Sequence, residues 1–244
     1  MKLIAANWKM NPGTLDEARR ILAILEHLIL KLPKDKVEVV ICAPFVYLPG
    51  LKHSVHRAVL GAQNVSAEDK GPYTGEISAQ MLKNLGVKHV IVGHSERRAL
   101  GETDELIAKK IQQCQAHGLH PILCVGYGTT KNTSVPVEKR IITKQLDITL
   151  KGKGFNKDEF TIAYEPAWTI SRGPGTAKPI SPERAAEVIE FIKNAEPHAR
   201  VIYGASITAK NAPELAAFRS IEGGLVGGAS LNPEEFINII KAFI

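Results

Sequence analysis

The chain has 244 residues, of which 44% are hydrophobic and 23% charged, which is ordinary usage for a globular protein able to bury a sizeable core. It has no run approaching the ~20 apolar residues of a membrane span, and its first eight residues suit a strand better than a signal peptide. The formal charge of +6 comes from scattered cations that form no basic stripe, so nucleic-acid and membrane partners are not expected, whereas a small anionic substrate would be attracted.

Strand-like and helical segments alternate along the chain. Short apolar runs predict eight strands, at Leu3–Trp8, Val37–Cys42, Ala58–Gln63, His89–Val92, Pro121–Val125, Phe160–Tyr164, Val201–Tyr203 and Gly224–Val226. Longer amphipathic segments predict eight helices, at Leu15–Lys31, Phe45–His53, Ser78–Leu85, Asp104–His117, Val137–Leu150, Pro182–Asn194, Ala212–Phe218 and Pro233–Phe243. Residues able to cap a first helical turn precede four of them, namely Thr14, Thr103, Ser181 and Asn232.

Strict alternation of strands and helices fits either an open doubly wound sheet or a closed (β/α)8 barrel. An open dinucleotide-binding sheet would require a Gly-x-Gly-x-x-Gly turn after the first strand, but that strand ends in Asn7-Trp8-Lys9. Eight units in 244 residues match the barrel. We therefore expect an α/β protein with one (β/α)8 TIM-barrel domain over residues 1–244.

The three cysteines have no spacing typical of a metal site. Cys42 and Cys124 lie in apolar strand runs, and Cys114 lies in a predicted helix. We expect all three thiols to be reduced and structural, in a cytoplasmic protein.

Polar residues follow several predicted strands at their carboxyl ends, where barrel enzymes place their chemistry. Glu165 follows the sixth strand and His94 the fourth, while Asn7 and Lys9 lie two residues apart at the end of the first. Removing a proton next to a carbonyl requires a base and groups that stabilise the enolate charge. The carboxylate, the imidazole and the cation together supply both.

The loops after the last two strands carry small residues. Ser206 follows the seventh strand, and Gly227 and Gly228 follow the eighth. These two loops often bind phosphate in such barrels, and consecutive backbone amides can surround an anion. The sequence therefore predicts a phosphate site near Glu165.

Five short segments in chain order resemble the triosephosphate isomerase family, and together they cover essentially the whole chain. They are Ala5-Ala6-Asn7-Trp8-Lys9-Met10-Asn11, Gln63-Asn64 with Tyr73-Thr74-Gly75-Glu76, Gly93-His94-Ser95-Glu96-Arg97-Arg98, Tyr164-Glu165-Pro166-Ala167-Trp168 and Leu225-Val226-Gly227-Gly228-Ala229-Ser230-Leu231. The resemblance implies a glycolytic and gluconeogenic isomerase without metal or cofactor. It would interconvert dihydroxyacetone phosphate and D-glyceraldehyde 3-phosphate through an ene-diolate.

The resemblance also implies a role for each site residue. Glu165 would be the base, His94 a neutral electrophile that donates a hydrogen bond, Lys9 a cation that neutralises developing charge, and Asn7 a residue that orients the substrate. The expected phosphate contacts come from Ser206 and from the backbone N–H groups of Ser171, Gly227 and Gly228. Glu96 and Arg97 are expected to form an ion-pair group, either buried or just behind the catalytic side chains, that orients the loop of His94 and the dimer contact.

The lid after Glu165 departs from the family pattern between Ala167 and Lys178. We therefore expect the chemistry to be intact and the motion of the lid to differ from that of the family. Trp168 is expected to anchor this lid. Tyr127 stands where the family has a glutamate that meets the lid tryptophan. Because a buried indole N–H needs an acceptor, we predict that the Tyr127 hydroxyl accepts the hydrogen bond from Trp168.

The region Asn64–Ile77 is too long for an ordinary connection. By resemblance, its residues Thr74, Gly75 and Glu76 reach the active site of a second copy of the chain, which predicts a homodimer. Two alternatives to the isomerase remain open. One is an aldolase-type barrel that uses Lys9 as a Schiff base, and the other is a scaffold protein that has lost turnover.

Overall fold

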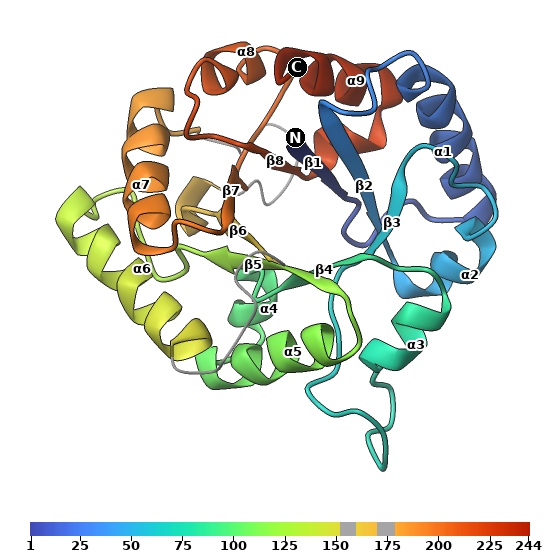
Figure 1. Ribbon diagram of the computed structural model, residues 1–244, viewed down its shortest axis with the longest axis horizontal. Coiled ribbons are helices and arrows are strands. Elements are labelled where there is room, and N and C mark those ends of the chain that lie inside the picture. Colours follow the sequence, from blue (N-terminus) through green and yellow to red (C-terminus); the bar gives the residue numbers. More distant parts are fainter. Residues whose placement is uncertain (152–159, 170–178) are drawn as a thin grey trace.

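The computed structural model describes residues 1–151, 160–169 and 179–244. In these residues, parallel strands pair in chain order and close into a barrel, because β1 pairs with both β2 and β8 (Figure 1). The strands are β1 (Lys2–Asn7), β2 (Val37–Ala43), β3 (Val59–Ala62), β4 (His89–Val92), β5 (His120–Val125), β6 (Thr161–Tyr164), β7 (Arg200–Tyr203) and β8 (Gly223–Val226). The predicted barrel is confirmed.

Helices surround the barrel on the outside (Figure 1). They are α1 (Leu15–Ile29), α2 (Leu48–Leu51), α3 (Ala79–Asn84), α4 (Ser95–Ala99), α5 (Asp104–Ala116), α6 (Val135–Leu150), α7 (Pro182–Ala195), α8 (Ala212–Ala216) and α9 (Pro233–Ala242). The prediction of one helix after each strand was wrong after β4, where α4 precedes α5. A helix of little more than one turn is too short to produce a periodic apolar pattern.

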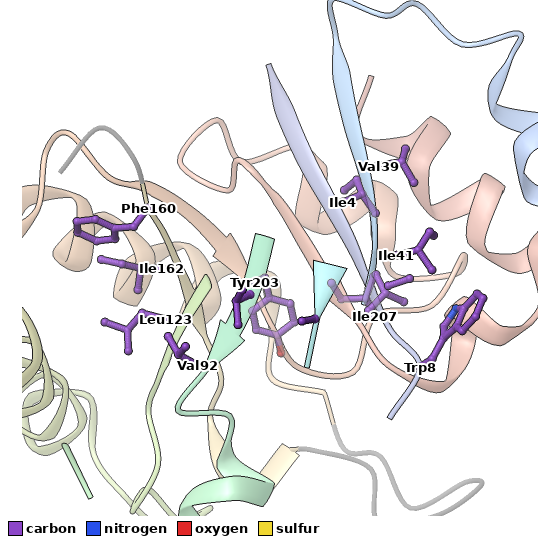
Figure 2. Packing of buried hydrophobic residues seen from close by; sticks show 14 of the residues in the cluster. Ile4, Trp8, Val39, Ile41, Val92, Leu123, Phe160, Ile162, Tyr203 and Ile207 are labelled. Carbon is purple, nitrogen blue, oxygen red and sulfur yellow. The ribbon is translucent and has the colours of Figure 1, made fainter. Parts of the chain in front are cut away.

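Side chains of each strand alternate between two apolar clusters, one inside the barrel and one under the helices. In β1, Leu3 and Ala5 belong to the inner cluster, while Ile4 and Ala6 belong to the outer one. Figure 2 shows outer-cluster side chains, including Ile4, around the strands. Because both faces of a strand are buried, its sequence is a continuous apolar run, which is why the strands were predictable.

The four predicted helix caps are confirmed. A side-chain oxygen of each accepts a hydrogen bond from a backbone N–H in the first turn, which otherwise has no helical partner. The pairs are Thr14 with Glu17, Thr103 with Leu106, Ser181 with Arg184, and Asn232 with both Glu234 and Glu235.

All three cysteines are buried and free. Burial raises the pKa of the Cys114 thiol to about 12, so this side chain stays a neutral core residue. The prediction of structural thiols is confirmed.

The chain between β3 and α3 projects outward past the ring of helices (Figure 1). Thr74, Gly75 and Glu76 lie in this projection and are exposed to solvent. None of the helices in the described ranges is long and apolar enough to cross a membrane.

Candidate active site

The polar residues that follow β1, β4 and β6 lie at one end of the barrel, because parallel strands that close in register bring their carboxyl ends together. Backbone hydrogen bonds fix the end of β6 between its neighbours. The Glu165 N–H donates to the Val125 carbonyl of β5 at 2.8 Å, and the Gly204 N–H donates to the Tyr164 carbonyl at 2.8 Å. The backbone of Glu165 is therefore held by the sheet itself.

The Glu165 carboxylate is almost fully buried, with a relative exposure of 1%. Its Oε1 lies 3.5 Å from His94 Nε2, and its Oε2 lies 3.4 Å from the Ser95 N–H, at the start of α4. Burial raises the pKa of this carboxyl, while His94, the Cys124 thiol, the Ser95 N–H and Lys9 lower it by less. A raised pKa makes the carboxylate a stronger base.

Two glycines leave the space that Glu165 occupies. A Cβ atom at Gly204 would lie 2.7 Å from Glu165 Cγ, and one at Gly126 would lie 2.5 Å from the Glu165 carbonyl oxygen. Gly126 also has a φ of +111°, which side chains rarely adopt. Any larger residue at either position would displace Glu165.

His94 precedes α4 and caps it with its ring. Its Nδ1 accepts a hydrogen bond from the Glu96 N–H at 3.2 Å, so Nδ1 carries a lone pair and the ring proton is on Nε2. Nε2 is the atom that points to Glu165. The helix start therefore fixes both the tautomer and the direction of the ring.

Lys9 has a left-handed backbone, with φ of +53°, a conformation that costs a residue other than glycine about 1–2 kcal/mol. The Asn7 side chain accepts from the Lys9 N–H at 3.0 Å, and the Gln63 side chain donates to the Lys9 carbonyl at 2.9 Å. These contacts offset the strain and direct Lys9 Nζ toward Glu96, at 2.6 Å.

Two loops were predicted to bind phosphate, and the loop after β8 lies next to the Lys9 side chain. A Cβ atom at Gly227 would be 3.4 Å from Lys9 Cε, and Gly228 begins the short 3-10 helix η4 (Gly228–Leu231). The Ser206 hydroxyl donates to the Thr169 carbonyl at 2.7 Å, which joins the loop after β7 to the segment after Glu165. The predicted contact from Ser171 lies outside the described residues.

Glu96 and Arg97 each form an ion pair beside the loop of His94, but neither side chain is buried. The Glu96 side chain is half-exposed and pairs with Lys9, whereas Arg97 Nε pairs with Glu102 Oε1 at 2.7 Å. Successive residues of a helix point in different directions, so the two side chains meet different partners. Glu96 nevertheless touches both Lys9 and His94, with its Oε2 3.6 Å from His94 Nδ1.

The predicted hydrogen bond between Tyr127 and Trp168 is absent. Trp168 Nε1 is buried and has no hydrogen-bond partner in the described part of the chain, and Tyr127 is 37% exposed. Trp168 belongs to the 3-10 turn η3 (Ala167–Thr169). Its ring instead faces the Arg184 guanidinium, whose central carbon is 5.9 Å from the ring centroid.

Sequence reasoning missed two buried charged residues beside the site. Arg98 donates to the Gly93 carbonyl at 2.7 Å and to the Cys124 carbonyl at 3.1 Å, and so ties the His94 loop to β5. Glu138 of α6 is fully buried and accepts a hydrogen bond from the Tyr164 hydroxyl at 2.7 Å. Arg98 stood in the family-like segment from Gly93 without an assigned role, and Glu138 stood in a predicted helix with no sign of its partners.

The arrangement defines the class of protein: a (β/α)8 barrel with a buried carboxylate beside an imidazole, and with a lysine near them, at the carboxyl ends of its strands, where barrel enzymes place their chemistry. In the described ranges, no group of three or more His, Cys, Asp or Glu side chains is placed to hold a metal ion.

Comparisons with known proteins identify the family. The family model for triosephosphate isomerase matches residues 2–243, so the chain belongs to the triosephosphate isomerase family. The chain is 44% identical to triosephosphate isomerase of Thiobacillus denitrificans, over 99% of this chain and 98% of that protein.

Two further comparisons agree with this assignment. The chain is 41% identical to triosephosphate isomerase of Shewanella denitrificans, over 97% of this chain and 95% of the relative. The crystal structure of triosephosphate isomerase from Bartonella henselae is similar, with a TM-score of 0.86, 34% identity and coverage of 99% and 98% of the two chains. The aldolase and scaffold alternatives are not favoured by these matches.

Proposed function

We propose that this protein interconverts dihydroxyacetone phosphate and D-glyceraldehyde 3-phosphate by moving a proton between neighbouring carbons. Membership of the triosephosphate isomerase family supports the reaction. The single observation that carries the mechanism is the buried Glu165 carboxylate, 3.5 Å from His94 Nε2. A base and a hydrogen-bond donor lie side by side there, as removal of a proton next to a carbonyl requires.

In the proposed mechanism, Glu165 takes the proton from one carbon and returns it to the other. His94 donates from Nε2 to the oxygens of the ene-diolate, because its Nδ1 is occupied as an acceptor. The hydroxyl proton passes from one of these oxygens to the other, so that the carbonyl and the hydroxyl exchange places. Lys9 balances the negative charge, and Asn7 supports the backbone of Lys9 and orients the substrate. These steps use side chains and backbone groups alone.

We assign the phosphate to the loops after β7 and β8, with contacts from Ser206 and from the N–H groups of Ser171, Gly227 and Gly228. The closeness of Gly227 to the Lys9 side chain supports this assignment, because the phosphate would then lie beside a cation. A bound phosphate far from Gly227 and Gly228 in a substrate-analogue complex would contradict it.

We further propose that the enzyme works in the cytoplasm as a homodimer. Met10, which directly follows Lys9, is 95% exposed, and the loop of Thr74 to Glu76 projects from the barrel. Exposed apolar residues beside the site, together with a projecting loop, suit an interface with a second copy.

An assay that couples glyceraldehyde 3-phosphate formation to NAD reduction tests the proposed function. We expect turnover by the wild type and a kcat about 10²–10⁴ times lower for Glu165→Gln, since one proton-transfer group contributes about that much. Glu190→Gln, at an exposed glutamate of α7, should behave as wild type. Undiminished activity of Glu165→Gln would reject Glu165 as the base, and borohydride trapping of substrate on Lys9 would favour the aldolase alternative.

A further inference from the structure

The segment that follows the proposed base is held by a pair of charged residues from two helices. Glu138, on α6, is 0% exposed, and Arg184 lies in the first turn of α7. Arg184 donates to Glu138 Oε2 at 2.8 Å and to the Thr133 carbonyl at 2.9 Å. The other carboxylate oxygen of Glu138 accepts from the Tyr164 hydroxyl at 2.7 Å.

The pair touches the chain on both sides of Glu165. Tyr164 directly precedes the base, and Trp168 follows it by three residues. Trp168 Nε1 has no hydrogen-bond partner among the described residues, and its ring packs against the outer apolar cluster with the Arg184 guanidinium over its face. The Glu138 carboxylate thus contacts Tyr164 directly, and it contacts Trp168 through Arg184.

The burial of Glu138 calls for a reason other than stability, while the side chain of Arg184 stays 26% exposed. Removing a carboxylate from water costs about as much as its attraction to a cation returns, so such a pair contributes little to folding. The pair does impose a fixed geometry, because a planar guanidinium can bond a carboxylate and stack on an aromatic ring at once. Through these contacts the pair restrains the segment from Tyr164 to Thr169.

We propose that Glu138 and Arg184 are positioning residues, which hold the segment from Tyr164 to Thr169 and thereby place the Glu165 carboxylate for proton transfer. The inference rests on the proposed function of Glu165 as the base. It assigns the two residues no contact with substrate. Their removal should therefore lower kcat and leave KM nearly unchanged.

The test compares Arg184→Met with Lys139→Met. Lys139 pairs with Glu187, at 2.8 Å, and so joins the same helices α6 and α7 at an exposed site. Both variants remove one cation and one interhelical ion pair. We expect kcat to fall about tenfold for Arg184→Met, since small misplacements of reacting groups have effects of this order or larger. Lys139→Met should stay within twofold of wild type.

Tryptophan fluorescence gives a second readout that a merely structural role would not change. Trp8 is fully buried and Trp168 only partly, so acrylamide quenching reports mainly on Trp168. We expect stronger quenching for Arg184→Met and no change for Lys139→Met. Arg184→Lys keeps the charge but loses the planar group, and its kcat and quenching should lie between those of wild type and Arg184→Met.

Several results would overturn the proposal. The first is an Arg184→Met variant whose kcat per folded molecule equals that of Lys139→Met and whose acrylamide quenching equals that of wild type. This result would overturn the proposal even if the melting temperature of Arg184→Met falls. If Arg184→Met does not fold, Glu138→Gln and Arg184→Lys replace it in the test. The proposal is then overturned if both variants have the same kcat and the same quenching as wild type. Wild-type protein without isomerase activity would instead reject the proposed function, and quenching would still test whether Arg184 holds Trp168.

Discussion

His94 Nδ1 accepts a hydrogen bond from the backbone N–H of Glu96 at 3.2 Å. The donor is a main-chain group at the start of α4, which cannot lose its proton or rotate away without unwinding the helix. The contact therefore holds the His94 proton on Nε2, the nitrogen that lies 3.5 Å from Glu165.

The first prediction concerns this tautomer. Nitrogen NMR of the imidazole at neutral pH should show a protonated Nε2 and an unprotonated Nδ1 for His94. The exposed His27 and His53 provide the comparison, because an imidazole in water exchanges between its two tautomers. A His94 ring that carries its proton on Nδ1 would contradict the structure.

The second prediction concerns the space beside the base. Gly204→Ala would place a Cβ atom 2.7 Å from Glu165 Cγ, so the carboxylate must move. We expect kcat to fall about 10–100-fold, with a loss of stability of about 1–3 kcal/mol from overpacking. Gly13→Ala is the control, because no atom lies within 4 Å of a Cβ there. Equal kinetics for the two variants would mean that Glu165 tolerates displacement.

The third prediction concerns a buried ion pair away from the base. Lys110 Nζ lies 2.5 Å from Glu102 Oε1, and both side chains are buried. Despite burial, which raises it, the pKa of Glu102 is lowered overall by Lys110 and Arg97. Lys110→Met removes the buried partner and leaves Glu102 with the partly exposed Arg97, so the free energy of unfolding should fall by about 1–3 kcal/mol.

Urea unfolding measures this loss. Lys109→Met, at an exposed neighbour in the same helix, should change the free energy of unfolding by no more than about 0.5 kcal/mol. The double variant with Glu102→Gln should recover part of the stability, because the buried carboxylate that lost Lys110 is then neutral. A Lys110→Met variant as stable as Lys109→Met would contradict the prediction.

The fourth prediction is a pH dependence of stability. Burial raises the pKa of Glu165 in the folded protein above its ordinary value of 4.5. At pH below 4.5 the carboxyl is protonated in both states and costs nothing, while at higher pH folding must bury a charge. Wild-type stability relative to Glu165→Gln should therefore fall as the pH rises through the folded-state pKa.

Melting temperatures from pH 4 to pH 8 would check this dependence. Glu165→Gln should melt near wild type at the acid end and above it at the alkaline end. Glu190→Gln should track wild type throughout, because its carboxylate is exposed. A gap between Glu165→Gln and wild type that is the same at every pH would show that no raised pKa is involved.

The fifth prediction concerns assembly. A homodimer built with the loop after β3 should be broken by Thr74→Arg, which adds a charged side chain to an exposed loop residue. We expect sedimentation to show monomers with strongly reduced activity. Thr143→Arg, on the exposed face of α6, should remain dimeric. A fully active monomeric wild type would reject the dimer proposal.

The barrel was predictable because each of its elements leaves a local pattern. Strands buried on both faces are continuous apolar runs, and Ile4 and Leu3 are both needed, one for each cluster. Caps such as Thr14 and Asn232 mark where helices begin. The parallel order then brings the strand ends together, so Lys9, His94 and Glu165 could be assigned to one site without coordinates.

The pairing of charges could not be predicted in the same way. Glu96 pairs with Lys9, 87 residues away, and Arg97 pairs with Glu102. Trp168 meets Arg184 in place of the predicted Tyr127. The wrong partner for Trp168 came from placing Tyr127 in the family pattern, whereas the packing of helices on the barrel decides which side chains touch.

The sequence by itself determined the strands, the helix starts and the residues at the strand ends, because hydrophobic alternation and capping are local properties of the chain. Only the tertiary structure decided that Glu138 is buried against Tyr164 and Arg184, which are 26 and 46 residues away. The physical reason is that an ion pair forms where separate helices converge. No local pattern records the angle at which α6 and α7 pack on β6.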